Sequence, residues 1–168
     1  MWDGETLPVP VEHIADSCFG LHVRDVDDLS AAPGAPELGP GQALSGLLLP
    51  SLGEIWVNRG ESERWPPRRR FTICHELGHW CMHRRDGGAI FCRSGTVEPK
   101  GEGAGEAKPV VPQIEEEAQI FAAALLMPGQ LVRRYYEDGN DFEALCGIFN
   151  ASRAAMGRRM HSAVPPEA

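Results

Sequence analysis

The chain has 168 residues, of which 42% are apolar and 24% are charged. These proportions are typical of a folded globular protein, and the length suits one domain with at most a small appendage, which excludes a disordered chain and two independent cores. Sixteen basic residues against 24 acidic ones give a formal net charge of -8. This charge repels a phosphate backbone at long range and excludes a generic nucleic-acid-binding surface.

No segment is apolar enough to cross a membrane, because the longest apolar run, residues 120–127, is far shorter than the roughly 20 residues that a span needs. The N-terminus, Met-Trp-Asp-Gly-Glu, is acidic where a secretory signal has basic residues. We therefore expect a cytoplasmic protein with no membrane partner. The five cysteines form no C-x-x-C pair, so they indicate neither a zinc ribbon nor a disulfide framework, and we expect most of them to be buried.

The first half of the chain predicts a helix, a strand and a β-hairpin. Residues 8–20 have the apolar spacing of a short helix, and a strand follows over residues 21–26 before a loop rich in Pro, Gly and Ala at residues 30–42. Two runs, residues 43–49 and 54–58, are separated by Pro-Ser-Leu-Gly, which is typical of a hairpin.

A polar turn after the hairpin leads to Pro66 and Pro67, which suit the first turn of a helix that continues to His83. Apolar side chains cover most of the circumference of this helix, so we expect it to be buried. A short strand is expected at residues 87–92, followed by a mobile loop at residues 94–112 that is rich in Gly, Pro, Glu and Lys.

The remaining residues predict four helices, at 113–127, 130–136, 142–149 and 152–160. The last two helices flank a turn at Asn150 and resemble a helix-turn-helix.

Ser152 is a good N-cap for the last helix, and Arg153, Arg158 and Arg159 would give it a basic face. Because the chain as a whole is acidic, we favour packing against the core over direct DNA binding for this segment.

The buried helix contains His75-Glu76-Leu77-Gly78-His79, an H-E-x-x-H motif. Residues four apart lie on the same side of a helix, so both imidazoles can reach one cation, while Glu76 lies beside them and can bond to a water on that metal. Two histidines and a glutamate are costly to bury without a metal or hydrogen-bond partners. Two packed core histidines beside an incidental glutamate are the weaker interpretation.

A third protein ligand is expected from the start of the helix at residues 113–127, where three glutamates follow one another. Glu115 precedes Ala118 by three residues and Ala122 by seven, which places it on the inward face, and Glu117 is the second choice by its relation to Phe121. At least one of the three glutamates needs no role beyond a favourable interaction with the helix dipole.

Two blocks of sequence resemble the ImmA/IrrE family of metallopeptidases. Residues 69–80 read RRFTICHELGHW and residues 115–128 read EEEAQIFAAALLMP. The family's typical forms are H-E-[IL]-G-H and E-x-E-A-N-x-F-A-A-x-L-L-M-P, and the resemblance extends over nearly the whole chain.

This resemblance implies that His75, His79 and Glu115 bind zinc and that Glu76 is the catalytic general base. It also implies a minimal zincin-like domain of α+β class at residues 1–140, with a small sheet beside the active-site helix and a helix-turn-helix-like segment at residues 141–163 packed on it. The family's activity implies a zinc-dependent endopeptidase in which a zinc-bound water attacks the peptide carbonyl, and its substrates imply a helix-turn-helix transcriptional repressor as the partner that is cleaved.

The resemblance also raises points that the sequence leaves open. Gln119 stands where the family has Asn, and we expect its amide to bond to a ligand or to the backbone. The strand at residues 54–58 would lie along the cleft, either as a plain sheet member or as the strand on which an extended substrate pairs. The oxyanion could be stabilised by His83, Tyr135 or Tyr136, and His83 is otherwise a hydrogen-bonding or surface residue.

Two further interpretations concern the cysteines of the active-site helix and the function as a whole. Cys74 and Cys81 are seven residues apart on one face, which favours packing over coordination. The alternative to an enzyme is a non-catalytic zinc-containing module that regulates a repressor or a toxin-antitoxin partner by contact. A variant of Glu76 separates the two hypotheses, because a binding module would remain active.

Overall fold

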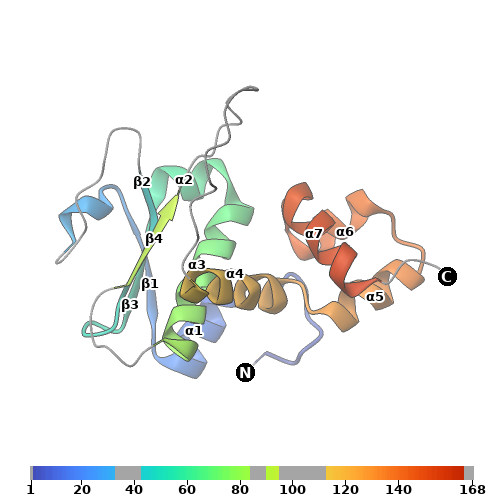
Figure 1. Ribbon diagram of the computed structural model, residues 1–168, viewed down its shortest axis with the longest axis horizontal. Helices are drawn as coiled ribbons and strands as arrows, with labels where there is room; N and C mark the ends of the chain where they lie inside the picture. The colour runs from blue at the N-terminus through green and yellow to red at the C-terminus, as the bar shows by residue number, and fades with distance from the viewer. Residues whose placement is uncertain (1, 33–42, 84–89, 95–112, 165–168) are drawn as a thin grey trace.

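The computed structural model describes residues 2–32, 43–83, 90–94 and 113–164 of an α+β protein (Figure 1). In chain order the elements are α1 (Val11–Phe19), β1 (His22–Val26), the short 3-10 helix η1 (Leu29–Ala31), β2 (Ala43–Leu49), β3 (Glu54–Asn58), α2 (Arg59–Arg64), α3 (Pro66–Met82), β4 (Ile90–Ser94), α4 (Gln113–Leu126), α5 (Gly129–Glu137), α6 (Phe142–Phe149) and α7 (Arg153–Ala163).

The four strands form one mixed sheet in the order β1-β3-β2-β4. The predicted hairpin is confirmed, since β2 and β3 pair antiparallel with Leu48 opposite Ile55. β1 lies parallel to β3, and β4 lies antiparallel to β2. The strand at residues 54–58 therefore has a neighbour on both sides, and the prediction that a substrate pairs with it is wrong.

The two faces of the sheet carry different parts of the core. Ile55 and Val57 of β3 belong to the main core together with buried residues of α3, whereas Trp56 packs in a smaller cluster with Leu47 and with Leu29 of η1. This alternation along β3 is what a strand buried on both faces requires. The face on which α3 packs is the one that carries the chemistry described below.

The α-helices lie on one side of the sheet, and η1 lies on the other (Figure 1). α3 packs on β2 and β3, and α4 packs on α3. The helices α5, α6 and α7 form a group at the end of the molecule opposite to the sheet. The buried cluster is continuous from α1 to α7, and a domain boundary at residue 140 remains a prediction. Among the residues described, no helix is long and apolar enough to cross a bilayer.

Two expected segments differ from what is observed. The polar turn after Asn58 is a short helix, α2, whose first turn is capped because the Asn58 side chain accepts a hydrogen bond from the backbone N–H of Glu61. Six residues are too few for a periodic apolar pattern, so only the cap could have predicted this helix. The strand expected at residues 87–92 is β4 at Ile90–Ser94. Residues 33–42 and 95–112, where most of two expected loops fall, lie outside the described residues.

The expectation that most cysteines are buried is wrong for the residues described. Cys74 is buried, Cys146 is half-buried, and Cys18 and Cys81 are exposed. Cys81 is exposed because the continuously buried part of α3 ends at His79, and its last turn is only partly covered. Packing therefore explains Cys74 and does not explain Cys81.

The turn between α6 and α7 has the expected chemistry. Asn150 adopts a left-handed conformation with φ 47° and ψ 53°, and the Ser152 side chain accepts the backbone N–H of Ala155 as an N-cap. Arg159 Nε donates to the carbonyl oxygen of Met127 at 2.6 Å, and Arg153 pairs with Glu143. Two of the three arginines of the expected basic face are therefore engaged within the chain.

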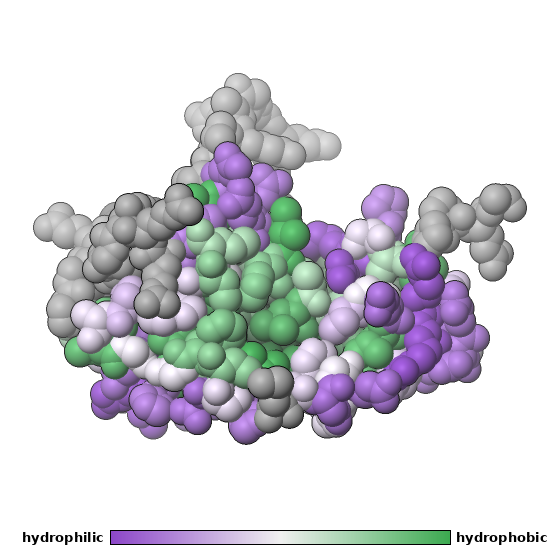
Figure 2. Space-filling model, turned by 90° about the horizontal axis from the view of Figure 1, so that it is seen from below, coloured by the Kyte–Doolittle hydropathy of each residue, from purple (hydrophilic) through white to green (hydrophobic). Residues whose placement is uncertain are grey.

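The surface at this end of the molecule is polar. Seen from below, hydrophilic residues cover the outer side of the C-terminal helices, and the apolar surface is concentrated nearer the middle of the molecule (Figure 2). The apolar sides of α5, α6 and α7 belong to the core, where Val132, Phe149 and Met156 are fully buried. This distribution is the one expected of helices that pack on a core through one face.

Candidate metal centre

Helix α3 brings both histidines of the H-E-x-x-H motif to one place. Pro66 and Pro67 occupy its first turn, and every residue from Thr72 to His79 is buried. The His75 and His79 rings meet edge to face with their centroids 4.6 Å apart, and their Nε2 atoms are 3.0 Å apart. The spacing of four residues thus places both ring nitrogens at a single point, as the sequence predicts.

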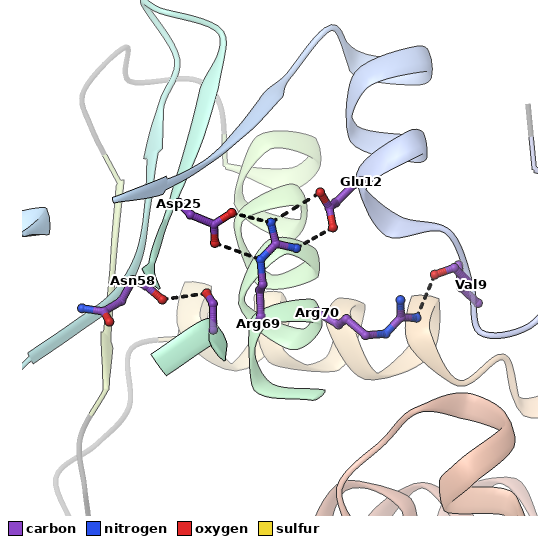
Figure 3. A network of polar contacts seen from close by, with 7 residues as sticks. Val9, Glu12, Asp25, Asn58, Arg69 and Arg70 are labelled. Carbon is purple, nitrogen blue, oxygen red and sulfur yellow. Dashed lines mark hydrogen bonds and ion pairs between the residues drawn. The ribbon is translucent and has the colours of Figure 1, made fainter. Parts of the chain in front are cut away.

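Polar contacts hold the N-terminal half of this helix against the rest of the domain (Figure 3). Arg69 donates two hydrogen bonds of 3.0 Å to the carboxylate of Asp25 in β1, and it also pairs with Glu12 in α1. Arg70 Nη2 donates to the carbonyl oxygen of Val9 at 2.7 Å. A two-pronged arginine-carboxylate pair fixes direction as well as distance, so these contacts set the position of α3 relative to β1 and α1.

Glu115 of α4 completes the cluster. Its Oε2 lies 3.2 Å from His75 Nε2, and its Oε1 lies 3.3 Å from His79 Nε2. The ligand atoms of the three residues all lie within 4.8 Å of one another. Glu117 points elsewhere, because it accepts a hydrogen bond from Gln113 and lies 3.6 Å from His83 Nε2. The geometry therefore groups the first choice for the third ligand with the histidines and leaves the second choice outside.

A glycine in α3 allows α4 to come this close. A Cβ atom on Gly78 would lie 3.1 Å from Cα of Ala118 and 3.2 Å from its carbonyl oxygen, closer than ordinary contact. Ala118 lies three residues after Glu115 on α4, so the close approach at Gly78 and the position of the Glu115 carboxylate are linked. This role of Gly78 was not predicted from the sequence, although a glycine inside a buried helix is itself a signal of close packing.

The charges of the cluster differ between its two glutamates. Burial alone would raise the pKa of Glu115, but hydrogen bonds with His75 and His79 lower it to about 2. Burial raises the pKa of Glu76 well above its usual range, and repulsion from the Glu115 carboxylate raises it further. Glu115 is thus suited to hold a cation as a carboxylate, whereas Glu76 is suited to take up and release a proton.

The donor set and its spacing fit a metal ion. No proton arrangement makes all three contacts of the two Nε2 atoms and the carboxylate favourable, because two imidazoles that both donate to Glu115 bring their N–H groups face to face at 3.0 Å. In a tetrahedral centre with bonds of ~2.0–2.1 Å, ligand atoms are ~3.3 Å apart. The observed separations of 3.0, 3.2 and 3.3 Å are close to this value.

The outer nitrogens of the two imidazoles depart from the usual arrangement of metal ligands. Ligand histidines commonly donate from the second ring nitrogen to an oxygen atom. Here Nδ1 of His75 and Nδ1 of His79 are buried and have no hydrogen-bond partner within the described part of the chain. The two rings are therefore held by packing and not by hydrogen bonds from Nδ1. Phe71, for example, lies near the His75 ring at a centroid distance of 6.4 Å.

Glu76 lies beside the cluster without joining it. Its side chain is fully buried, and neither carboxylate oxygen makes a hydrogen bond of ordinary geometry among the residues described, although the backbone of Leu48 approaches it. A buried carboxyl group with so little hydrogen bonding carries a large desolvation cost, which is tolerated mainly where the group has a chemical task. The role of Glu76 as general base remains a prediction, and its surroundings agree with that role.

Of the other predicted site residues, none is placed in the cluster. His83 is mostly buried with its ring centroid 5.5 Å from that of His79. Tyr135 packs edge to face on Phe149, and Tyr136 is exposed, so the residue that stabilises an oxyanion stays open. The expected hydrogen bond of Gln119 is wrong for the described residues, because this side chain points to solvent from the outer side of α4.

A known protein family matches the part of the chain that contains this cluster. The model of the Peptidase_M78 family, described as the IrrE N-terminal-like domain, matches residues 53–161, which include His75, Glu76, His79 and Glu115. Residues 1–52 lie outside the match. A search of curated proteins found no match to the chain. The resemblance to the ImmA/IrrE family is confirmed, and the chain belongs to the IrrE N-terminal-like family and carries its metallopeptidase domain.

Proposed function

We propose that the chain is a zinc-dependent endopeptidase with a minimal zincin-like fold. The observation that carries the proposal is the meeting of His75, His79 and Glu115 at one point, with the buried Glu76 carboxyl group beside them. Two imidazoles and one carboxylate are a donor set that favours zinc over magnesium or calcium and that leaves a fourth position open in catalytic sites.

His75, His79 and Glu115 would hold the ion. Zinc in such a site acts as a Lewis acid that polarises a carbonyl group and lowers the pKa of water. The Glu76 carboxylate accepts a proton from the attacking water and later donates it to the leaving amine nitrogen. Its burial and the nearby Glu115 charge raise its pKa, and a carboxyl group of raised pKa holds the proton more readily between these two steps.

The substrate segment is proposed to lie along β4. Among the strands that the structure describes, β4 stands at an edge of the sheet, and its partner β2 contacts α3 directly. An extended peptide can add to such an edge by main-chain hydrogen bonds, which position a scissile bond without fixing its side chains. This replaces the strand at residues 54–58, which is enclosed by β1 and β2.

The identity of the substrate as a helix-turn-helix repressor is proposed from the family resemblance alone. A cytoplasmic location is proposed with it, since such a repressor acts on DNA inside the cell. A purified repressor encoded near the gene for this chain is the first substrate to test. Fragments detected by intact mass analysis, absent when a chelator is added, would support the pairing, and an intact repressor under every metal condition would contradict it.

The variant Glu76→Gln tests the mechanism. The wild-type protein with zinc, the wild-type protein with a chelator and the zinc-loaded variant are incubated with a peptide library, and products are measured by mass spectrometry. We expect the variant to keep its zinc and to lose ~10²–10⁴-fold in rate, as is usual for removal of a general base. Cleavage by the variant at the wild-type rate would contradict the mechanism.

A second candidate function is a binding module in which the metal is structural. The observation that favours it is that the cluster joins α3 to α4, so a bound metal would stabilise this contact whether or not it is catalytic. In that case Glu76→Gln would leave the activity toward the partner unchanged, and the peptide library would stay uncleaved. The same experiment therefore distinguishes the two functions.

A further inference from the structure

Gly46 occupies a position in β2 where the sheet faces α3. It pairs with Val57 of β3 on one side and with Cys92 of β4 on the other, and a register shift in the pairing with β4 lies between Leu44 and Gly46. Leu44 belongs to the cluster on the far face of the sheet. Ser45 Oγ accepts a hydrogen bond from Arg68 of α3 at 3.2 Å. The irregularity thus turns both Ser45 and Gly46 toward α3.

Backbone conformation does not explain a glycine here. Gly46 is not among the glycines with positive φ, so other residues could adopt its backbone angles. Glycine weakens a strand interior, and its presence there often marks a close approach of another group. A Cβ atom on Gly46 would lie 2.3 Å from Cγ2 of Thr72 and 3.2 Å from Oε1 of Glu76. Glycine is therefore needed at position 46 because neighbouring side chains of α3 occupy the space that a Cβ atom would take.

The side chains that lie against Gly46 project from one face of α3. Arg68, Thr72 and Glu76 follow one another at intervals of four residues and so lie on the same side of the helix, facing β2. Neither oxygen of Glu76 makes a hydrogen bond of ordinary geometry among the described residues, and the backbone of Leu48 in β2 is the polar group that approaches it. The direction of the carboxylate therefore depends on how closely β2 packs against it. Gly46 lies at this contact, since a methyl group added to it would come within 3.2 Å of Oε1.

We infer that Gly46 is a positioning residue for the Glu76 carboxylate: the absent side chain at this point of β2 fixes where the proposed general base sits. The inference rests on the proposed function in that Glu76 acts as the base. It differs from a purely structural role because the 3.2 Å contact to Oε1 is separate from the 2.3 Å contact to Thr72. The two contacts can be changed independently.

The test uses Gly46→Ala, Thr72→Ser and the double variant. Gly46→Ala alone is expected to be strongly destabilised or unfolded, because Thr72 Cγ2 cannot share the space. Thr72→Ser removes that methyl group, so the double variant is expected to fold while its new Cβ still displaces Glu76 Oε1. Thr72→Ser alone is the first control, and Gly157→Ala, whose Cβ would meet nothing within 4 Å, is the second.

Three measurements are made on each folded variant: zinc affinity by competition with a chelator, kcat and KM on a cleaved peptide, and the carboxyl carbon NMR signal of Glu76 in the metal-free protein. For the double variant we expect zinc affinity and KM close to those of the wild type, kcat lower by ~10–100-fold because a base is misplaced by a fraction of an ångström, and a shifted Glu76 signal. Both controls are expected to match the wild type in all three.

The outcomes separate the inference from the proposed function. A double variant with wild-type kcat and an unshifted Glu76 signal overturns the role of Gly46 and leaves the enzyme mechanism standing. Wild-type protein that cleaves nothing overturns the function, while a Glu76 signal shifted only in the double variant still supports the positioning role. A double variant that does not fold also counts against the inference, because the space would then serve packing of the sheet and not the carboxylate.

Discussion

The substitution Gly78→Ala tests whether the contact between α3 and α4 sets the metal centre. The new Cβ would lie 3.1 Å from Cα of Ala118, 3.2 Å from its carbonyl oxygen and 3.2 Å from Phe121 Cδ1. Two of these atoms are backbone, so α4 itself must move by a few tenths of an ångström. Glu115 lies on the same helix, three residues earlier, and its carboxylate oxygens stand only 3.2 and 3.3 Å from the two Nε2 atoms.

Two effects on stability oppose one another in this variant. Alanine is favoured over glycine inside a helix by ~1 kcal/mol, whereas an extra methyl group in a packed interior costs ~1–3 kcal/mol. The free energy of unfolding of the metal-free protein is therefore expected to fall by only about 0–2 kcal/mol. Zinc affinity is expected to fall about tenfold, the lower end of the ~10–100-fold typical of changes next to metal ligands, because the long Glu115 side chain can recover part of the shift.

The assay is a zinc titration in competition with a chromogenic chelator, together with urea unfolding of the metal-free protein. Gly147→Ala is the matched control, because its Cβ would meet nothing within 4 Å. Adding Ala118→Gly to Gly78→Ala should not restore affinity, since the closest contacts are to the Cα and carbonyl oxygen of Ala118 and not to its side chain. Wild-type zinc affinity in Gly78→Ala, or its recovery by Ala118→Gly, would refute this reasoning.

Two further substitutions test neighbouring parts of the account. Glu115→Gln should weaken zinc binding by at least ~10-fold, whereas Glu117→Gln should leave it unchanged; equal losses in a chelator competition would show that the third ligand is misassigned. Hydrogen bonds from Arg69 hold the pKa of Asp25 below its usual range, so the stability that this pair contributes is present at neutral pH and is lost as the pH falls below ~4. Asp25→Asn should therefore lower the free energy of unfolding by about 1 kcal/mol at pH 7, after allowance for the partial exposure of the pair, and by little at pH 3, with the exposed Asp27→Asn as control. A loss of equal size at both pH values in urea unfolding would contradict this origin.

Local chemistry made much of the architecture predictable. The prolines at the start of α3, the left-handed turn at Asn150 and the Ser152 cap all act through neighbouring residues, and each is found as expected. The order of strands depends on contacts between distant segments. No local pattern indicates that β1 pairs in parallel with β3, and this pairing is what removes β3 from the edge of the sheet.

The candidate site was predictable to a similar degree. The spacing of His75 and His79 placed them together, and the inward face of α4 indicated Glu115. The roles of Gly46 and Gly78 were not predicted from the sequence. Each glycine matters because it has no side chain, and only the packed structure shows which atoms of neighbouring elements occupy the space that a side chain would fill. The hydrogen bond expected of Gln119 is likewise not found among the described residues, because this residue is exposed on α4.

The measurement that bears most directly on the metal centre is a crystal structure of the zinc-loaded wild-type protein with anomalous scattering recorded at the zinc absorption edge. The account predicts one strong peak at a distance of ~2.0–2.2 Å from Nε2 of His75, Nε2 of His79 and the carboxylate of Glu115. The Glu76 carboxylate should lie beside the peak without bonding to it. A peak bound instead by Glu117 or His83, or no peak between the two imidazoles in crystals grown with ample zinc, would contradict it.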